Sequence, residues 1–156
     1  SNSPHGFHLK PSQQRAIEAA DVVFYIDDNF ESFLLPSFHT MRKDARRVAM
    51  TSNPNIRVLY HHRPGGVWVE KGDAANGKNY HIWLSPAYGA MMVQQIAETL
   101  AEIRPAYREK YMENAREMRV RLQRLNALLD EQLSPYAGTP YVVYHDAYRY
   151  FEAMYG

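Results

Sequence analysis

The chain contains no cysteine, so none of its 156 residues can form a disulfide, act as a thiolate nucleophile or build a cysteine zinc finger. It also lacks an excess of charge: 18 Lys and Arg residues stand against 17 Asp and Glu residues, a formal net charge of +1. Bulk electrostatics therefore gives no reason to expect a nucleic-acid or membrane-surface partner. No apolar run approaches the roughly 20 residues of a membrane-spanning helix, and no segment has the pattern of a signal peptide. The seven histidines are the only side chains that suggest unusual chemistry.

Short apolar runs alternate with helical patterns along the chain. The unbroken run at residues 22–26 predicts a strand that is buried on both faces, as in a parallel sheet. Residues 57–60 predict a second, weaker strand, and residues 141–144 predict another buried one. Residues 61–80 predict a loop, with a short hairpin at residues 67–69. Strands that alternate with helices indicate an α/β fold with a parallel sheet.

Helices are predicted at residues 30–38, from Ser85 to Pro105, at 105–133 and at 147–155. Ser85 and Pro86 match an N-cap followed by proline at the first helical position. The segment 105–133 is the longest, about 43 Å at 1.5 Å per residue. Its apolar residues follow one stripe and its other faces are charged, which favours an amphipathic helix lying on a core. A rod that bridges two lobes and a dimerising helix remain open as alternatives.

Histidines in this chain do not form a compact motif, and a lone histidine is more often a surface or core residue than a metal ligand. His39 lies among Arg and Lys residues and is expected at the surface. His61 and His62 lie in the predicted loop, where we expect them to face solvent or to make at best a weak auxiliary metal contact. His145 follows a predicted strand and precedes a helix, and ligands gather at such strand ends. Three distant histidines can make an exchangeable zinc site, but spacing alone does not choose them.

Several motifs together resemble the metal-binding solute-binding proteins of bacterial ABC transporters (the cluster A-I family), and most of all its zinc-specific, ZnuA-like branch. They run in the family's order over essentially the whole chain: SPHGFHLKPS at 3–12, ADVV at 20–23, FESFL at 30–34, YHIWLSP at 80–86 and YHDAYRYF at 144–151. The resemblance implies two α/β parallel-sheet lobes joined by a long helix, with one zinc ion bound between them.

Carried over by motif, the resemblance implies that His5, His81 and His145 are the zinc ligands. Manganese-binding relatives carry a carboxylate at the position of His145, so the match favours Zn²⁺ as the transported ligand, and neutral imidazole suits zinc. Two residues depart from the family pattern. Gly6 replaces a usual aspartate, and Arg149 replaces a usual glycine and brings a positive charge that would weaken zinc binding.

The resemblance further implies that the chain is a fragment, because the family members are considerably longer. We expect residues 1–104 to form a partial amino-terminal lobe without its first strands, 105–133 the linking helix, and 134–156 the first strand and helix of the carboxy-terminal lobe. Such a fragment leaves strand edges and an apolar stripe uncovered, which predicts a homodimer or a domain swap. The implied partner is an ABC transporter permease, and the implied location is periplasmic or on the exterior of the cell envelope.

Two alternatives to zinc delivery remain open. A fragment of this kind would be structural only, with weak metal binding or none. A three-histidine zinc hydrolase would need a general base, for which Asp146 is the only candidate at a motif. A carboxylate just before a helix is more often a cap, however. We therefore expect a binding protein rather than an enzyme.

Overall fold

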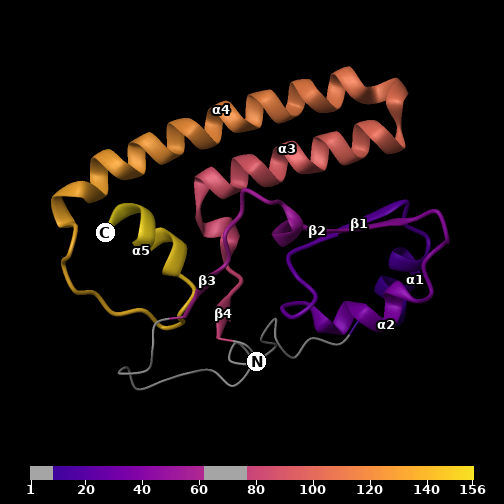
Figure 1. The fold of residues 1–156 in the computed structure, drawn as a ribbon, viewed down its shortest axis with the longest axis horizontal. Coiled ribbons are helices and arrows are strands. Elements are labelled where there is room, and N and C mark those ends of the chain that lie inside the picture. Colours follow the sequence, from indigo (N-terminus) through magenta and orange to yellow (C-terminus); the bar gives the residue numbers. More distant parts are fainter. Residues whose placement is uncertain (1–8, 62–76) are drawn as a thin grey trace.

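The computed structural model of the chain describes residues 9–61 and 77–156 (Figure 1). Its helices and strands are α1 (Pro11–Glu18), β1 (Val22–Tyr25), α2 (Leu35–Phe38), β2 (Arg46–Ala49), β3 (Leu59–Tyr60), β4 (Lys78–Asn79), α3 (Pro86–Ile103), α4 (Arg108–Leu133) and α5 (Arg149–Tyr155). Short 3-10 turns lie at Ser32–Leu34, Met50–Ser52, Ile82–Leu84, Pro105–Tyr107 and Ser134–Tyr136.

The predicted parallel sheet is confirmed, since β1 and β2 run parallel, with Val22 opposite Arg46 and Tyr25 opposite Ala49. Successive residues of the first strand point to opposite faces of the sheet. Val23 and Tyr25 pack with α1 and α2, in a core that contains Leu34 and Phe38. Phe24 and Ile26 pack on the other face, beneath α3. The run at 22–26 is apolar throughout because both of its faces are covered. β2 was not predicted, because two exposed arginines interrupt its apolar pattern.

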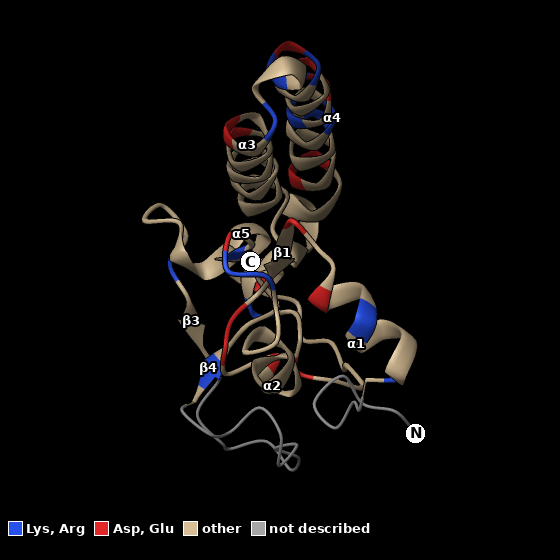
Figure 2. Ribbon diagram, turned by 90° about the vertical axis from the view of Figure 1, so that its right-hand side faces the viewer, with Lys and Arg blue, Asp and Glu red and all other residues tan. Residues whose placement is uncertain are grey.

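Two long antiparallel helices, α3 and α4, lie side by side along the outside of the molecule (Figure 1). Ser85 caps α3 by accepting a hydrogen bond from the backbone N–H of Tyr88 at 3.2 Å, as predicted. The predicted long helix is also present, and its Ala115 is buried. Acidic and basic residues follow one another along α4 (Figure 2). Among the described residues, no helix combines the length and apolarity that crossing a membrane requires.

The strand predicted at residues 141–144 is absent, and this prediction is wrong. Val142 is 97% exposed and Tyr144 fully exposed. A strand is stable only beside another strand that pairs its N–H and C=O groups. In the described part of the chain, no strand lies next to this segment. The composition favours a strand, but its partner is missing.

The strand predicted at residues 57–60 is shorter than expected and belongs to a different sheet. Only Leu59–Tyr60 is extended in a ladder, and it pairs antiparallel with Lys78–Asn79. These two strands are called here the β3–β4 hairpin. The further hairpin predicted at residues 67–69 lies outside the described residues.

Helix α5 returns from the end of α4 and packs against the β3–β4 hairpin (Figure 1). Its Tyr150 is 2% exposed and shares one core with Met50, Ile56 and Ile82. The carboxy-terminal segment therefore anchors in the same hydrophobic core as the first sheet. This docking fixes the position of the loop that precedes α5.

We expect substitution of Ile82 by alanine to destabilise the fold strongly, because Ile82 has no exposed surface. Loss of a fully buried isoleucine side chain typically lowers the free energy of unfolding by about 2–5 kcal/mol. Leu128→Ala is the control, since Leu128 is 47% exposed on α4, and its cost should stay within about 0.5 kcal/mol. Urea unfolding monitored by circular dichroism measures both. Equal effects of the two variants would contradict the core assignment.

Candidate metal centre

His81 lies between β4 and the 3-10 turn that leads into α3. The side chain of Ile82 next to it is fully buried, and Ser85 caps the helix that follows, so the chain on the carboxyl side of His81 is held firmly. His81 itself is 4% exposed. Phe30 meets its ring edge-on at 5.6 Å between centroids, and Trp83 lies at 5.1 Å. An imidazole in an aromatic surrounding is shielded from bulk water, which strengthens electrostatic interactions at its nitrogens.

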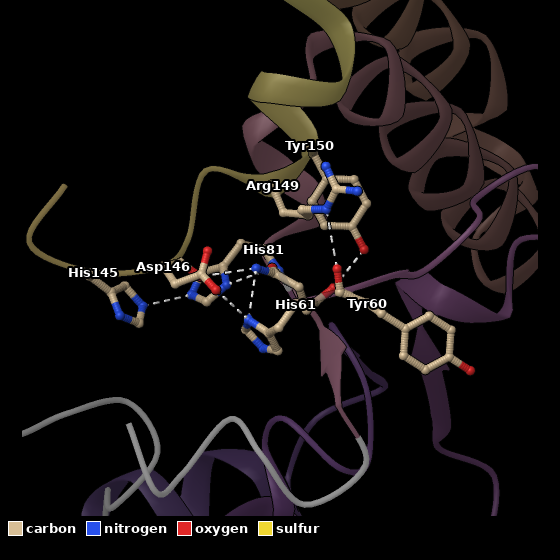
Figure 3. A network of polar contacts seen from close by, with 8 residues as sticks. Tyr60, His61, His81, His145, Asp146, Arg149 and Tyr150 are labelled. Atoms are coloured by element: carbon tan, nitrogen blue, oxygen red, sulfur yellow. Dashed lines mark hydrogen bonds and ion pairs between the residues drawn. The ribbon is translucent and has the colours of Figure 1, made fainter. Parts of the chain in front are cut away.

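His145 lies in the loop before α5, and its ring faces that of His81 (Figure 3). The two Nε2 atoms are 3.1 Å apart, and the rings meet edge to face at an interplanar angle of 75°. The two histidines are 64 positions apart in the sequence. The structure thus brings together two of the three histidines that the motifs single out.

Asn79 contacts both histidine-bearing segments. Its Oδ1 accepts from the backbone N–H of His81 at 3.0 Å and lies 2.9 Å from Nδ1 of the same ring. Its Nδ2 donates to the backbone carbonyl of Asp146 at 2.9 Å. Because an amide oxygen only accepts, Nδ1 of His81 carries the proton and Nε2 offers its lone pair toward His145. Sequence reasoning did not find Asn79. The only signal was its place two residues before His81.

His61 does not face solvent, so this prediction is wrong. Its side chain is 15% exposed, and its Nδ1 lies 3.0 Å from Oδ2 of Asp146 (Figure 3). The reason is the β3–β4 hairpin, which carries His61 from the end of β3 toward the loop before α5. Asp146 is not a helix cap either, since Tyr148 is the N-cap of α5 and no side chain caps this helix. His39 is exposed, as predicted, and His62 lies outside the described residues.

The residues after Asp146 tie α5 to the same hairpin. Arg149 donates from Nε to the backbone carbonyl of Tyr60 at 3.3 Å (Figure 3). Its guanidinium thus meets a carbonyl dipole on the hairpin. The hydroxyl of Tyr150 donates to the carbonyl of Asn79 at 2.6 Å and accepts from the backbone N–H of Leu59 at 2.9 Å. Burial raises the pKa of Tyr150 to about 12.

The carboxyl group next to this aromatic surrounding, that of Glu31, is half-buried. Glu31 follows Phe30 in the chain and accepts from the backbone N–H of Ile26. Burial raises the pKa of Glu31, because the charged carboxylate loses hydration there. Glu31 therefore stabilises the turn after β1 through this hydrogen bond.

The third expected ligand, His5, lies outside the described residues. Within residues 9–61 and 77–156, no group of three His, Cys, Asp or Glu side chains is arranged to hold a metal ion. The described part of the site is thus a facing pair of imidazoles, His81 and His145, in an aromatic surrounding. Neutral imidazole nitrogen is a ligand suited to zinc.

The fold places this chain among the solute-binding proteins, as a part of such a protein that includes its long helix. Two crystal structures match 99% of the chain and 55% of their own chains: a zinc-bound deletion variant of ZnuA (29% identity, TM-score 0.80) and ZnuA itself (27% identity, TM-score 0.81). The model of the family "Zinc-uptake complex component A periplasmic", ZnuA, matches residues 1–156. The chain belongs to the ZnuA family.

Relatives in the same family carry the name "High-affinity zinc uptake system protein ZnuA". The protein of Brucella abortus is 29% identical over all of this chain and 56% of its own length. That of Yersinia pestis is 28% identical over 99% of this chain and 53% of its own length. The chain therefore spans about half the length of the relatives it matches.

We predict that Tyr150→Phe destabilises the protein, because it leaves the carbonyl of Asn79 and the N–H of Leu59 without their buried partner. The free energy of unfolding at pH 7 should fall by about 1–3 kcal/mol. The difference in free energy of unfolding between the wild type and Tyr150→Phe should narrow between pH 10 and 12. In that range the folded wild type keeps the Tyr150 proton and the unfolded chain loses it, so rising pH destabilises the wild type.

Tyr136→Phe is the matched control, since Tyr136 is 66% exposed. It should change the free energy of unfolding by less than about 0.5 kcal/mol at pH 7. Denaturant titrations at pH 7, 10 and 12 give the comparison. A gap for Tyr150→Phe that stays constant up to pH 12 would contradict the assigned pKa.

Proposed function

We propose that the chain captures Zn²⁺ in a solute-binding protein that delivers the ion to an ABC transporter permease. The observation that carries the proposal is the 3.1 Å separation of the Nε2 atoms of His81 and His145. Two nitrogens that ligate one tetrahedral zinc at about 2.0–2.1 Å are about 3.3–3.4 Å apart. The pair thus stands within a few tenths of an ångström of the spacing that zinc needs.

His5 is the third ligand in this proposal, by its place in the first motif. An all-imidazole set favours zinc over manganese, which prefers carboxylate oxygen. With no thiolate among the ligands, the ion can be released to a permease. The names of the relatives, which are zinc uptake proteins, support the same ion.

We further propose residues 1–104 as the amino-terminal lobe, 105–133 as the linking helix and 134–156 as the start of the second lobe, in a periplasmic or envelope-exterior protein. No catalytic step is part of the proposal. Asp146, the carboxylate that a hydrolase would use as general base, is engaged with His61.

Zinc titration of the ligand variants tests this function. His81→Ala and His145→Ala should each weaken zinc binding by at least ~100-fold, or ~2.7 kcal/mol, since each removes one of three ligands. His5→Ala should do the same. His39→Ala, an exposed histidine away from these motifs, should bind as the wild type does. Competition against a chelating dye of known affinity measures all four, and unchanged affinity in the His81 and His145 variants would remove these residues from the site.

We also propose that copies of this 156-residue chain pair through residues 141–144. Val142 and Tyr144 are almost completely exposed, and the segment from Gln132 to Tyr144 carries no Asp, Glu, Lys or Arg. Valine and tyrosine favour strands. Residues 141–144 pair with no strand in the described part of the chain, so pairing with a second copy would add backbone hydrogen bonds.

Light scattering at micromolar concentration should accordingly give twice the mass of one chain. Val142→Lys should give the mass of one chain, because a lysine on an exposed strand discourages pairing. Val120→Lys on α4, where Val120 is 39% exposed, is the matched control and should leave the dimer intact. A monomeric wild type would refute the pairing.

A further inference from the structure

We infer that Asn79 is a positioning residue of the zinc site: its one amide sets the tautomer of His81 and holds the segment that carries His145. This inference rests on the proposed function, because it assigns a role toward the same ion. Asn79 lies in β4, has no exposed surface and is not a ligand itself.

Asn79 fixes the position of the proton on His81. A neutral imidazole carries one proton, on Nδ1 or on Nε2, and only the nitrogen without the proton can bind a metal. Asn79 Oδ1 lies 2.9 Å from Nδ1 and accepts that proton's hydrogen bond. The lone pair therefore lies on Nε2, the atom that faces His145 at 3.1 Å. Without Asn79, the proton is free to move to Nε2 and block the metal-binding nitrogen.

The partners of the Asn79 side chain fix the orientation of its amide. Oδ1 also accepts from the backbone N–H of His81, and Nδ2 donates to the backbone carbonyl of Asp146. A flipped amide would set its NH₂ against the N–H of His81 and its oxygen against that carbonyl. Both contacts would then be repulsive, so only the observed orientation satisfies them.

Asn79 also sets the distance between the segments that carry His81 and His145. Asp146 is the residue directly after His145, and its carbonyl is held 2.9 Å from Asn79 Nδ2. Tyr150 holds the backbone carbonyl of Asn79 from the other side, at 2.6 Å. One asparagine thus connects the β3–β4 hairpin to the loop before α5 through its side chain, and to α5 itself through its backbone carbonyl. The His145 ring is placed by the same residue that sets the His81 proton.

The test compares Asn79→Leu and Asn79→Asp with the wild type. Leucine keeps the size and removes every polar contact of the amide, whereas aspartate keeps an acceptor for the Nδ1 proton and loses the donor to the Asp146 carbonyl. Asn126→Ala is the control, because Asn126 also fixes α5, by accepting from the hydroxyl of Tyr155 at 2.9 Å, but contacts neither histidine ligand. Zinc affinity is measured by dye competition. The tautomer of His81 is read from the ring ¹⁵N chemical shifts of the metal-free protein.

We expect the Nδ1–H tautomer in the wild type, in Asn79→Asp and in Asn126→Ala, and a shift toward the Nε2–H tautomer in Asn79→Leu. Zinc affinity should fall by about 10- to 100-fold in Asn79→Leu, the usual cost of losing a residue that orients a metal-binding histidine. It should be restored at least in part by Asn79→Asp and remain unchanged in Asn126→Ala. Amide hydrogen exchange at Ala147, whose N–H bonds the carbonyl of His145, should be faster in Asn79→Leu.

An Nε2–H tautomer of His81 in the metal-free wild type would overturn the inference, whether or not the variants fold. So would an Asn79→Leu variant with wild-type zinc affinity, or an Asn79→Asp variant in which the His81 proton lies on Nε2. The tautomer of His81 is measured without metal. Failure of the wild type to bind zinc would therefore refute the proposed function, and the NMR data would still test the role of Asn79.

Discussion

The two imidazoles can meet only because the β3–β4 hairpin holds the loop before α5. His81 and His145 come from segments 64 positions apart, and neither residue lies in a helix or a strand. What joins them is a set of hydrogen bonds from Asn79, Tyr150 and Arg149, together with the burial of the Tyr150 ring in the first core. If α5 left this core, His145 would leave with it, and the site would lose one of its facing nitrogens.

The chemistry of the site follows from the same arrangement. A metal ion binds tightly where its ligands are already in place, because little conformational entropy is then lost on binding. His81 is almost completely buried, with aromatic rings on two sides and an acceptor at Nδ1. Its other nitrogen, Nε2, is thereby held facing His145. The side chains of Asp146 and Arg149 are engaged with His61 and with a backbone carbonyl, so the nitrogens that face each other at the site are those of the two imidazoles.

The carboxy-terminal region shows how a local preference fails without a tertiary partner. Residues 141–144 have a composition typical of a buried strand, yet Val142 and Tyr144 stand in solvent. Eleven residues after Tyr144, Tyr155 is buried and hydrogen-bonded to Asn126 of α4. A helix satisfies its own backbone and needs only one covered face, whereas a strand depends on neighbouring strands for all of its backbone hydrogen bonds. The same region therefore contains a formed helix and a strand that is not formed.

Local signals in the sequence were sufficient for the elements whose physics is local. The Ser85 cap with Pro86, the long amphipathic α4 and the doubly buried β1 all follow from residues close together in the chain. The parallel sheet was likewise readable, whereas His81 and His145, whose rings face each other, were singled out through the family resemblance. Tertiary structure alone decided the rest. β2 pairs with β1 although its arginines break the apolar pattern, and His61 turns inward because a hairpin carries it to Asp146. Asn79 gains its place because its amide is enclosed by partners from three segments, and long-range contacts of this kind leave no periodic trace in a sequence.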